Sequence, residues 1–415
     1  MCGLTGIFHP DHGGTIDADL LRRMTTAIAH RGPDGDGFHV EPGVGLGHRR
    51  LSIVDVAGGA QPMYNEDESV VIVFNGEIYN FPELRPKLQA MGHVFRNRCD
   101  TEAIIHAWES WGPDCLHHLN GMFTLAIWDR GQETLFLARD RLGKKPLYYG
   151  RTASGAVVFG SELAALAPVP DLDRSISPAA VDDFFALGYV PDPGTIYAGI
   201  SKLPAAHYLL LRRGEPAVPR RYWSAPTESR PMEDADAVEA LRALLADCTR
   251  KRLMSDVPLG AFLSGGVDSS GVVATAAGLQ DDPLATFTIG FPGAEDERPL
   301  ARLVASRYGT AQHEDEAVPD YFEAARRQAR IFGEPFGDSS SVPTETVCEL
   351  ARRHVTVAIS GDGGDEVFAG YRRYRFHKMA EAVRAYVPAG LRRGVLGQLA
   401  QAYPKMDWAP RWLRA

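Results

Sequence analysis

A seven-residue run in the middle of the chain combines glycines, hydroxyls and a carboxylate: Ser264, Gly265, Gly266, Val267, Asp268, Ser269 and Ser270. The apolar run 257–263 before it predicts a buried strand, and 271–277 after it predicts a helix. Adjacent glycines let the backbone approach an anion, helix amides point at that anion, and serine hydroxyls add donors. The pattern therefore predicts a phosphate site, with Asp268 able to hold a divalent cation. A glycine-rich turn that merely caps a helix is the alternative.

The second chemical feature is Cys2, which follows the initiating methionine. If Met1 is removed, Cys2 carries both a thiol and a free α-amine with a pKa of about 7.7–8.0. Such an amine can accept the thiol proton near neutral pH, and the resulting thiolate is a strong nucleophile. The alternative is a cysteine that stands second by chance.

The first half of the chain predicts strands with few helices, and these elements must position the reactive groups. Apolar β-rich runs lie at 69–74, 123–128, 134–138 and 157–160, and helical periodicity appears at 18–29 and 102–108. Polar clusters lie next to these runs at 30–34, 47–55, 74–80 and 99–102. Strands in hairpins with a few helices favour an α+β layered domain.

The second half alternates strands and helices. A segment at 224–236 without periodicity is followed by helices at 237–253 and 297–308 and by strands at 285–290 and 355–359. This alternation indicates a parallel sheet, whose ligands bind beyond the carboxyl ends of the strands. The glycine-rich turns 264–266 and 360–365 both follow such ends, so we expect them to face one crevice.

Size and composition limit the class of protein. A chain of 415 residues predicts two domains, and a net charge of -9 argues against a nucleic-acid partner. The five cysteines show no zinc-binding spacing, which fits a reducing compartment. Without a long apolar run or a signal peptide, we expect a cytoplasmic protein that does not contact membranes.

The order of the motifs resembles a known family. Cys2 and the stretches HRGPD, RLSIVD, FNGEIYN and CDTE resemble the glutamine amidotransferase domain of the N-terminal-nucleophile type. SGGVDSS and SGDGGDE resemble the ATP-pyrophosphatase domain of glutamine-hydrolysing asparagine synthetases. The resemblance implies an α+β layered N-terminal domain of the αββα, N-terminal-nucleophile hydrolase type. An α/β parallel-sheet ATP-pyrophosphatase domain follows it. The expected boundaries are 2–220 and 237–415, with a linker at 221–236.

This resemblance implies roles in the first domain. Cys2 would attack the side-chain amide of glutamine, while Asn75 and the amide of Gly76 form an oxyanion hole. Arg50 would grip the substrate carboxylate, and Glu77 and Asp100 would bind the substrate ammonium. From the residues alone, Asn75 and Gly76 are also consistent with a hairpin turn, and Arg50 and Asp100 with a surface ion pair.

The resemblance also implies an ATP site in the second domain, made by Leu263, Ser264, Gly265, Gly266, Asp268, Ser269, Ile289, Ser360 and Gly361. Asp268 and Asp365 would hold Mg²⁺, and Asp362 would serve acyl-adenylate formation. The stretch 334–340 resembles one that lines the acceptor site. A solvated acidic turn is the alternative for Asp362 and Asp365.

The implied reaction is the ATP-dependent conversion of aspartate to asparagine, with glutamine as amide donor and an aspartyl-AMP intermediate. Ammonia would pass internally from the first domain to the second. One alternative keeps this chemistry on another carboxylate, such as a cell-envelope sugar acid or peptidoglycan. Another is a protein that only hydrolyses glutamine or only regulates a partner. Analogy with the family implies a homodimer.

The end of the chain departs from the family pattern. The stretch 371–374 continues that pattern, but family members extend well beyond 408–415 through a helical portion that carries a lysine near the intermediate. We therefore expect a fragment or a shortened protein, in which amide synthesis is affected more than glutamine hydrolysis.

Overall fold

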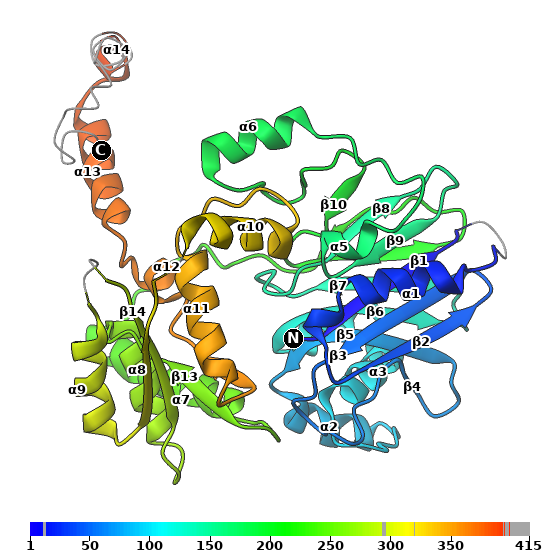
Figure 1. Ribbon diagram of the computed structural model, residues 1–415, viewed down its shortest axis with the longest axis horizontal. Helices are drawn as coiled ribbons and strands as arrows, with labels where there is room; N and C mark the ends of the chain where they lie inside the picture. The colour runs from blue at the N-terminus through cyan, green and yellow to red at the C-terminus, as the bar shows by residue number, and fades with distance from the viewer. Residues whose placement is uncertain (11–13, 293–295, 319, 393, 395–397, 399–415) are drawn as a thin grey trace.

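The computed structural model describes residues 1–10, 14–292, 296–318, 320–392, 394 and 398. Residues 408–415, where the chain was expected to depart from the family pattern, lie outside these ranges. Within these ranges the first half of the chain forms two stacked antiparallel sheets (Figure 1). One sheet has the order β10 (Ile200–Lys202), β8 (Tyr148–Arg151), β9 (Val157–Gly160), β1 (Gly3–Phe8), β3 (Val44–Arg50) and β2 (Gly35–Glu41). The other has the order β12 (Arg220–Arg221), β11 (His207–Arg212), β7 (Thr134–Arg139), β6 (Gly121–Asp129), β5 (Val70–Ile78) and β4 (Met63–Tyr64).

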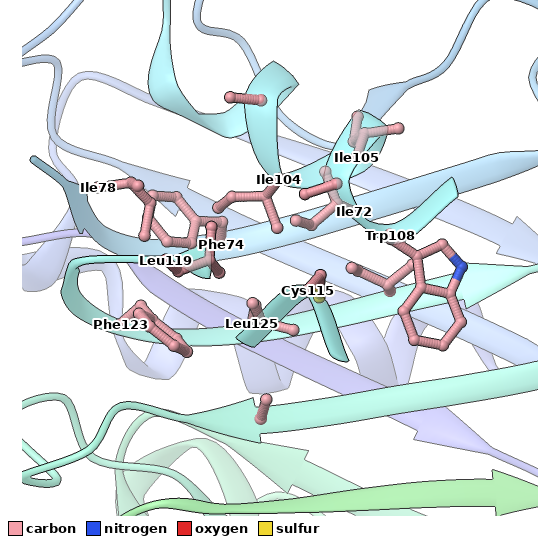
Figure 2. Packing of buried hydrophobic residues seen from close by; sticks show 14 of the residues in the cluster. Ile72, Phe74, Ile78, Ile104, Ile105, Trp108, Cys115, Leu119, Phe123 and Leu125 are labelled. Carbon is pink, nitrogen blue, oxygen red and sulfur yellow. The ribbon is translucent and has the colours of Figure 1, made fainter. Parts of the chain in front are cut away.

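Successive side chains of β5 point to opposite faces of its sheet, and their contacts show how the layers pack. Val71 and Val73 belong to the core between the sheets, whereas Ile72 and Phe74 face helices on the outer side. Figure 2 shows this outer core, where Phe74 lies near Ile78 and Leu119, and Ile72 lies near Ile105 and on the side of Trp108. Its helices are α2 (Phe81–Ala90), α3 (Asp100–Trp111) and α4 (Cys115–His118), with η2 (Gly112–Asp114) between the last two.

Helices α1 (Ala18–Ala27) and α5 (Leu163–Leu166) cover the outer face of the other sheet. The short η1 (Ala29–Arg31) follows α1, and α6 (Pro178–Leu187) packs on a smaller apolar cluster. The layers therefore run helix, sheet, sheet, helix, which confirms the predicted αββα arrangement.

The second half contains a parallel sheet in the order β15 (Ala311–Glu316), β14 (Ala285–Gly290), β13 (Leu259–Phe262) and β16 (Val357–Ile359). Helices α8 (Val267–Ala277) and α9 (Arg298–Tyr308) pack on Ala261 at one face, and α11 (Ser341–Arg352) packs on Phe287 at the other. The remaining helices of this part are α7 (Asp234–Arg252), α10 (Tyr321–Phe332), α12 (Gly364–Phe368), α13 (Arg372–Tyr386) and α14 (Ala389–Leu391). The predicted α/β parallel-sheet domain is confirmed.

Several element bounds differ from those expected. β5 continues to Ile78, α8 begins at Val267 rather than at Gly271, and β15 was not predicted. α7 begins at Asp234, inside the segment expected to be a linker. The domain boundaries themselves stay a prediction.

Polar contacts join the two halves. The amide of Asp256 donates to Ile53 O at 3.0 Å, and its carboxylate accepts from the amide of Asp55 at 2.7 Å. Lys202 and Glu334 form an ion pair of 2.6 Å that is largely shielded from solvent. None of the helices in the described ranges is both long and apolar enough to cross a bilayer.

Candidate functional site

Five of the residues predicted for the first site line one small pocket. Cys2 precedes β1, Arg50 ends β3, Gly76 and Glu77 lie in β5, and Asp100 begins α3. The tertiary structure thus brings together groups that are up to 98 positions apart in the chain. A thiol, a cation and two carboxylates around one cavity suit a small amino-acid ligand with a reactive side chain.

The thiol of Cys2 contacts the backbone of Leu51, the residue that follows β3. The amide of Leu51 donates to Cys2 Sγ at 3.4 Å, and the thiol lies 3.5 Å from Leu51 O. Arg31 Nε donates to Cys2 O at 2.9 Å, and Arg31 itself pairs with Glu162 at 2.7 Å. Burial raises the pKa of the Cys2 thiol, so a proton acceptor is needed before it can attack.

Asn75 and Gly76 lie within β5, opposite Thr124 and Phe123 of β6, so the alternative of a hairpin turn is wrong. Asn75 is 1% exposed, and its Nδ2 has no hydrogen-bond partner in the described structure. Gly76 is required for packing as well, because a Cβ there would lie 2.2 Å from Met122 O. Asn75 is not itself among the residues that line the pocket, although both of its neighbours are.

Arg50 and Asp100 do not form the surface ion pair that was the alternative. Arg50 donates to the carbonyl oxygens of Asp55 and Val56, each at 2.8 Å. Asp100 is 6% exposed and accepts from the amide of Ile78 at 2.8 Å. Both side chains are therefore oriented by backbone groups around the pocket.

The two carboxylates of the pocket are held in unfavourable surroundings. Burial, and then the charge of Asp100, raises the pKa of Glu77. Burial also raises the pKa of Asp100, against the opposing effect of its hydrogen bond from Ile78. A cationic ligand between them would relieve this repulsion, which is the role predicted for a substrate ammonium.

The raised pKa of Glu77 predicts how the free energy of unfolding depends on pH. Between the pKa of an unfolded glutamate, about 4.3, and the raised pKa of folded Glu77, only the folded state retains the proton, so stability falls as pH rises. Replacing Glu77 by glutamine removes this loss. We expect the variant to melt above the wild-type protein at pH 7–8, and at the same temperature below pH 4, in thermal unfolding without ligand. The exposed Glu239→Gln is the control. Equal melting temperatures for Glu77→Gln and wild type at every pH would contradict the assignment.

Sequence reasoning missed Lys145 as a component of the site. Lys145 is 4% exposed, its Nζ lies 2.7 Å from Met1 Sδ, and burial lowers its pKa to about 8. Burial, against the opposing charge of Cys2 and aided by the charges of Arg31 and Lys145, lowers the pKa of the Met1 amine to about 6. Adjacent Lys144 is exposed, so no local signal distinguishes the two lysines.

The two glycine-rich turns of the second half meet, as expected. A Cβ on Gly361 would lie 2.6 Å from Ser269 N, and one on Gly364 would lie 2.4 Å from the carboxyl carbon of Asp268. Because α8 begins at Val267, Asp268 and Ser269 stand in its first turn.

The donors of these turns fit a phosphate chain. Gly266 N donates to Ser264 Oγ, Ser264 and Ser269 hydroxyls are 3.0 Å apart, and buried Ser270 Oγ has no partner among the residues that the structure describes. Helix amides at the start of α8 add to this set. The other predicted ATP contacts lie at the same sheet edge: Leu263 follows β13, Gly265 precedes α8, Ile289 is near the end of β14, and Ser360 follows β16.

The acidic residues of this region differ in exposure. Asp268 and Asp365 are half-buried, which suits oxygen ligands of Mg²⁺. Asp362 is exposed and accepts a hydrogen bond from Ser360 at 3.0 Å, an arrangement also found in solvated turns.

The stretch 334–340 lies at the junction of the two halves. Glu334, besides pairing with Lys202, accepts from the amide of Ile196 at 3.1 Å. A pocket of about 210 Å³ is lined there by Pro146, Tyr148, Glu334 and Phe336 among others. Pro146 directly follows Lys145 in the chain.

Comparisons with known proteins assign a family model to each half of the chain. Residues 1–223 match the family model described as a glutamine amidotransferase domain, and residues 240–415 match the asparagine synthase model. The chain is 38% identical over 395 residues to a candidate glutamine-hydrolysing asparagine synthetase 2 of Methanocaldococcus jannaschii, covering 89% of this chain and 76% of that protein. It is 35% identical over 400 residues to glutamine-hydrolysing asparagine synthetase 1 of Bacillus subtilis, covering 95% of this chain and 63% of that protein.

A solved glutamine phosphoribosylpyrophosphate amidotransferase of B. subtilis aligns with a TM-score of 0.39 at 17% identity, covering 79% of this chain and 70% of that chain, a likeness too weak to bear on the assignment. The chain spans less than two thirds of the length of the Bacillus relative. Both family models together with the identity to these relatives show that the chain belongs to the glutamine-hydrolysing asparagine synthetase family.

Proposed function

We propose that this protein hydrolyses glutamine at Cys2 and uses the ammonia for ATP-dependent amidation of aspartate to asparagine. The observation that carries the proposal is the convergence of Cys2, Arg50, Gly76, Glu77 and Asp100 on one pocket. That set supplies a nucleophile, a carboxylate anchor and two ammonium acceptors, which together match a free glutamine.

In the first half-reaction, removal of Met1 would leave the α-amine on Cys2, where it takes the thiol proton. The thiolate attacks the glutamine amide carbon, and the developing oxyanion is stabilised by Asn75 Nδ2 and the amide of Gly76. Nδ2 has no hydrogen-bond partner in the part of the chain that the structure describes, which leaves it available as a donor for this role. Collapse of the tetrahedral species expels ammonia and leaves a thioester, which water converts to glutamate.

In the second half-reaction, the turns around Ser264 and Gly361 would bind ATP, with Asp268 and Asp365 as ligands for Mg²⁺. The aspartate carboxylate attacks the α-phosphorus, pyrophosphate leaves, and aspartyl-AMP forms. Ammonia then displaces AMP and gives asparagine. The pocket at the junction of the halves supports internal transfer, because it is lined both by Pro146, the residue after Lys145 in the chain, and by Glu334.

A substrate assay tests the proposal. The protein is incubated with glutamine, ATP and Mg²⁺, and glutamate, pyrophosphate and asparagine are measured with and without aspartate. We expect glutamate with glutamine alone, and pyrophosphate and asparagine in equal amounts with aspartate. Pyrophosphate release with a sugar acid or a peptidoglycan carboxylate instead would overturn the aspartate assignment. Glutamate without any pyrophosphate would leave a glutaminase.

We expect the charge of Lys145 to keep the α-amine, which accepts the thiol proton, unprotonated. A buried cation beside the chain terminus lowers the pKa of the α-amine, so removing that cation raises it. For Lys145→Met we expect the acidic limb of kcat/KM for glutamine to move up by about one pH unit. The exposed Lys144→Met should leave the limb in place. If the acidic limb of kcat/KM keeps its position in Lys145→Met, this electrostatic role of Lys145 is excluded.

Because the two glycine-rich turns are in close contact, we expect a substitution at Gly361 to weaken ATP binding without changing glutamine hydrolysis. In Gly361→Ala the new Cβ meets the backbone of Ser269, so the turns must separate. We expect ATP to bind about tenfold more weakly in a titration, with glutamine hydrolysis unchanged. Gly278→Ala is the control, because its Cβ meets nothing closer than 3.6 Å. Unaltered ATP affinity in Gly361→Ala would place the nucleotide elsewhere.

A further inference from the structure

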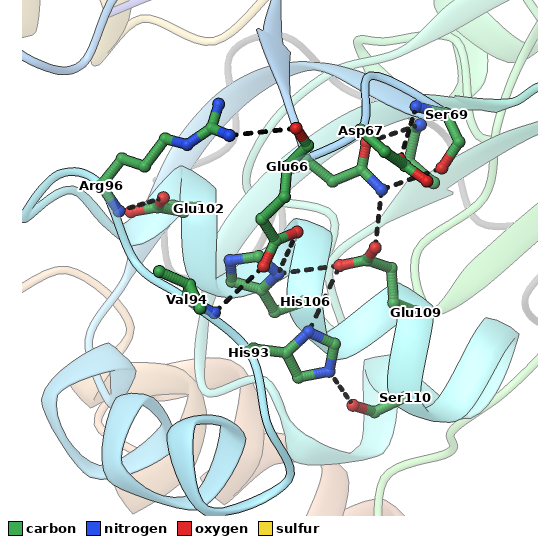
Figure 3. Close-up of polar contacts among 12 residues, drawn as sticks. Glu66, Asp67, Ser69, His93, Val94, Arg96, Glu102, His106, Glu109 and Ser110 are labelled. Atoms are coloured by element: carbon green, nitrogen blue, oxygen red, sulfur yellow. Dashed lines mark hydrogen bonds and ion pairs between the residues drawn. The ribbon is translucent and has the colours of Figure 1, made fainter.

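A second cluster of ionisable side chains lies in the first domain, apart from the pocket of Cys2. Glu66 comes from the turn between β4 and β5, His93 follows α2, and His106 and Glu109 lie three residues apart on α3. Residues at this helical spacing share one face. Figure 3 shows the four side chains pointing toward one another.

Their donor atoms are spaced like ligands of one ion. His106 Nδ1 lies 2.8 Å from Glu109 Oε2 and 3.9 Å from Glu66 Oε2, and His93 Nδ1 lies 3.5 Å from Glu109 Oε2. The ligand atoms of Glu66, His93 and His106 all lie within 4.8 Å of one another. A tetrahedral ion with bonds of about 2.0–2.2 Å needs its ligands about 3.3–3.6 Å apart. The cluster therefore needs only small side-chain shifts to surround an ion.

The far ends of three of these side chains, those of Glu66, Glu109 and His93, are already held by hydrogen bonds. The supporting hydrogen bonds are Val94 N to Glu66 Oε1 at 3.0 Å, Asn65 Nδ2 to Glu109 Oε1 at 2.7 Å, and Ser110 Oγ with His93 Nε2 at 2.8 Å. Buried His106 has no partner for Nε2 in the described part of the chain, so its polar contacts are all made through Nδ1. Such outer contacts orient ligands and raise the affinity of metal sites.

Charge favours a divalent cation. With both imidazoles neutral, the two carboxylates leave a net charge of −2 in a partly buried site. Two nitrogen and two carboxylate ligands in a compact arrangement suit Zn²⁺, whereas Mg²⁺ and Ca²⁺ prefer more oxygen ligands. We propose that Glu66, His93, His106 and Glu109 bind one Zn²⁺. The ion would tie α3, which begins at Asp100 of the glutamine pocket, to two neighbouring loops.

The test is a Zn²⁺ titration of the full chain after chelator treatment, followed by calorimetry and thermal unfolding. We expect one ion per chain and a rise in melting temperature with added Zn²⁺. Co²⁺ in its place should give a spectrum without thiolate charge-transfer bands, which excludes binding by the free cysteines. In Glu66→Gln and His93→Gln the affinity should fall at least about tenfold and the thermal shift should disappear.

Two matched controls keep this test specific. Glu68→Gln changes a carboxylate two positions from Glu66, and His377→Gln changes an exposed histidine on α13. Both should bind Zn²⁺ as the wild type does. The proposal is overturned if the wild-type chain binds no stoichiometric ion. It is equally overturned if Glu66→Gln and His93→Gln, shown to be folded by circular dichroism, bind Zn²⁺ with unchanged affinity.

Discussion

Replacing Cys2 by alanine is expected to abolish glutamate formation from glutamine, by about four orders of magnitude or more in kcat. The variant keeps the pocket but has no atom able to form the thioester. Arg50, Glu77 and Asp100 should still bind glutamine, so the loss appears in kcat while glutamine continues to protect the protein thermally. Steady-state kinetics and thermal unfolding with glutamine measure the two effects separately.

Cys248→Ala is the matched control, since Cys248 is a half-buried cysteine on α7 outside the pocket. Ammonia-dependent synthesis of asparagine should survive in Cys2→Ala. Intact-mass analysis after reaction with a glutamine-like electrophile should show a chain lacking Met1 and carrying one adduct. A protein that retains Met1 throughout and still hydrolyses glutamine at full rate would contradict the mechanism.

Asn75→Ala is expected to lower kcat for glutamine hydrolysis by about 10²–10³, with little change in KM. Asn75 Nδ2 is a buried donor that has no partner among the described residues and is held at a fixed place in β5, and an oxyanion is the acceptor that would satisfy it. The substrate carbonyl carries less charge than the tetrahedral species, so the missing donor matters chiefly in the transition state. Measured kcat and KM for the purified variant test this.

Exposed Asn120→Ala on the loop before β6 serves as the control and should hydrolyse glutamine at the wild-type rate. Asn75→Asp gives a second reading, because it keeps the size but places an acceptor where a donor is needed. It should be at least as impaired as the alanine variant. Loss of activity through KM alone, with kcat preserved, would show that Asn75 binds substrate and does not stabilise the oxyanion.

Local patterns were enough to predict much of the fold and of the chemistry. The alternation of strands and helices after residue 237 predicted the parallel sheet, because burial on both faces needs apolar runs. The same alternation placed both glycine-rich turns after the carboxyl ends of strands and predicted that they face one crevice, and Gly361 does lie against the start of α8.

Two other features of the fold could not be predicted from the local sequence. β15 has the sequence AQHEDE, which resembles a loop, yet it forms a strand because β14 offers it a free edge for pairing. Asn75 and Gly76 are a frequent hairpin dipeptide, but β6 pairs along both residues and holds them extended. In each case the hydrogen bonds of a distant strand outweighed the preference of the residues themselves.

The sequence by itself determined which reactive groups the protein has and the order in which they occur, from the thiol of Cys2 to the turn at Gly361. Only the tertiary structure decided which of them share a cavity and which are buried. Lys145 and Lys144 are identical in type and adjacent, yet one lies at the chain terminus and the other in solvent. The same holds for His93 and His106, whose approach to Glu66 depends on how α3 packs against two loops. Electrostatic roles depend on distance and burial, and these arise only when remote segments pack together.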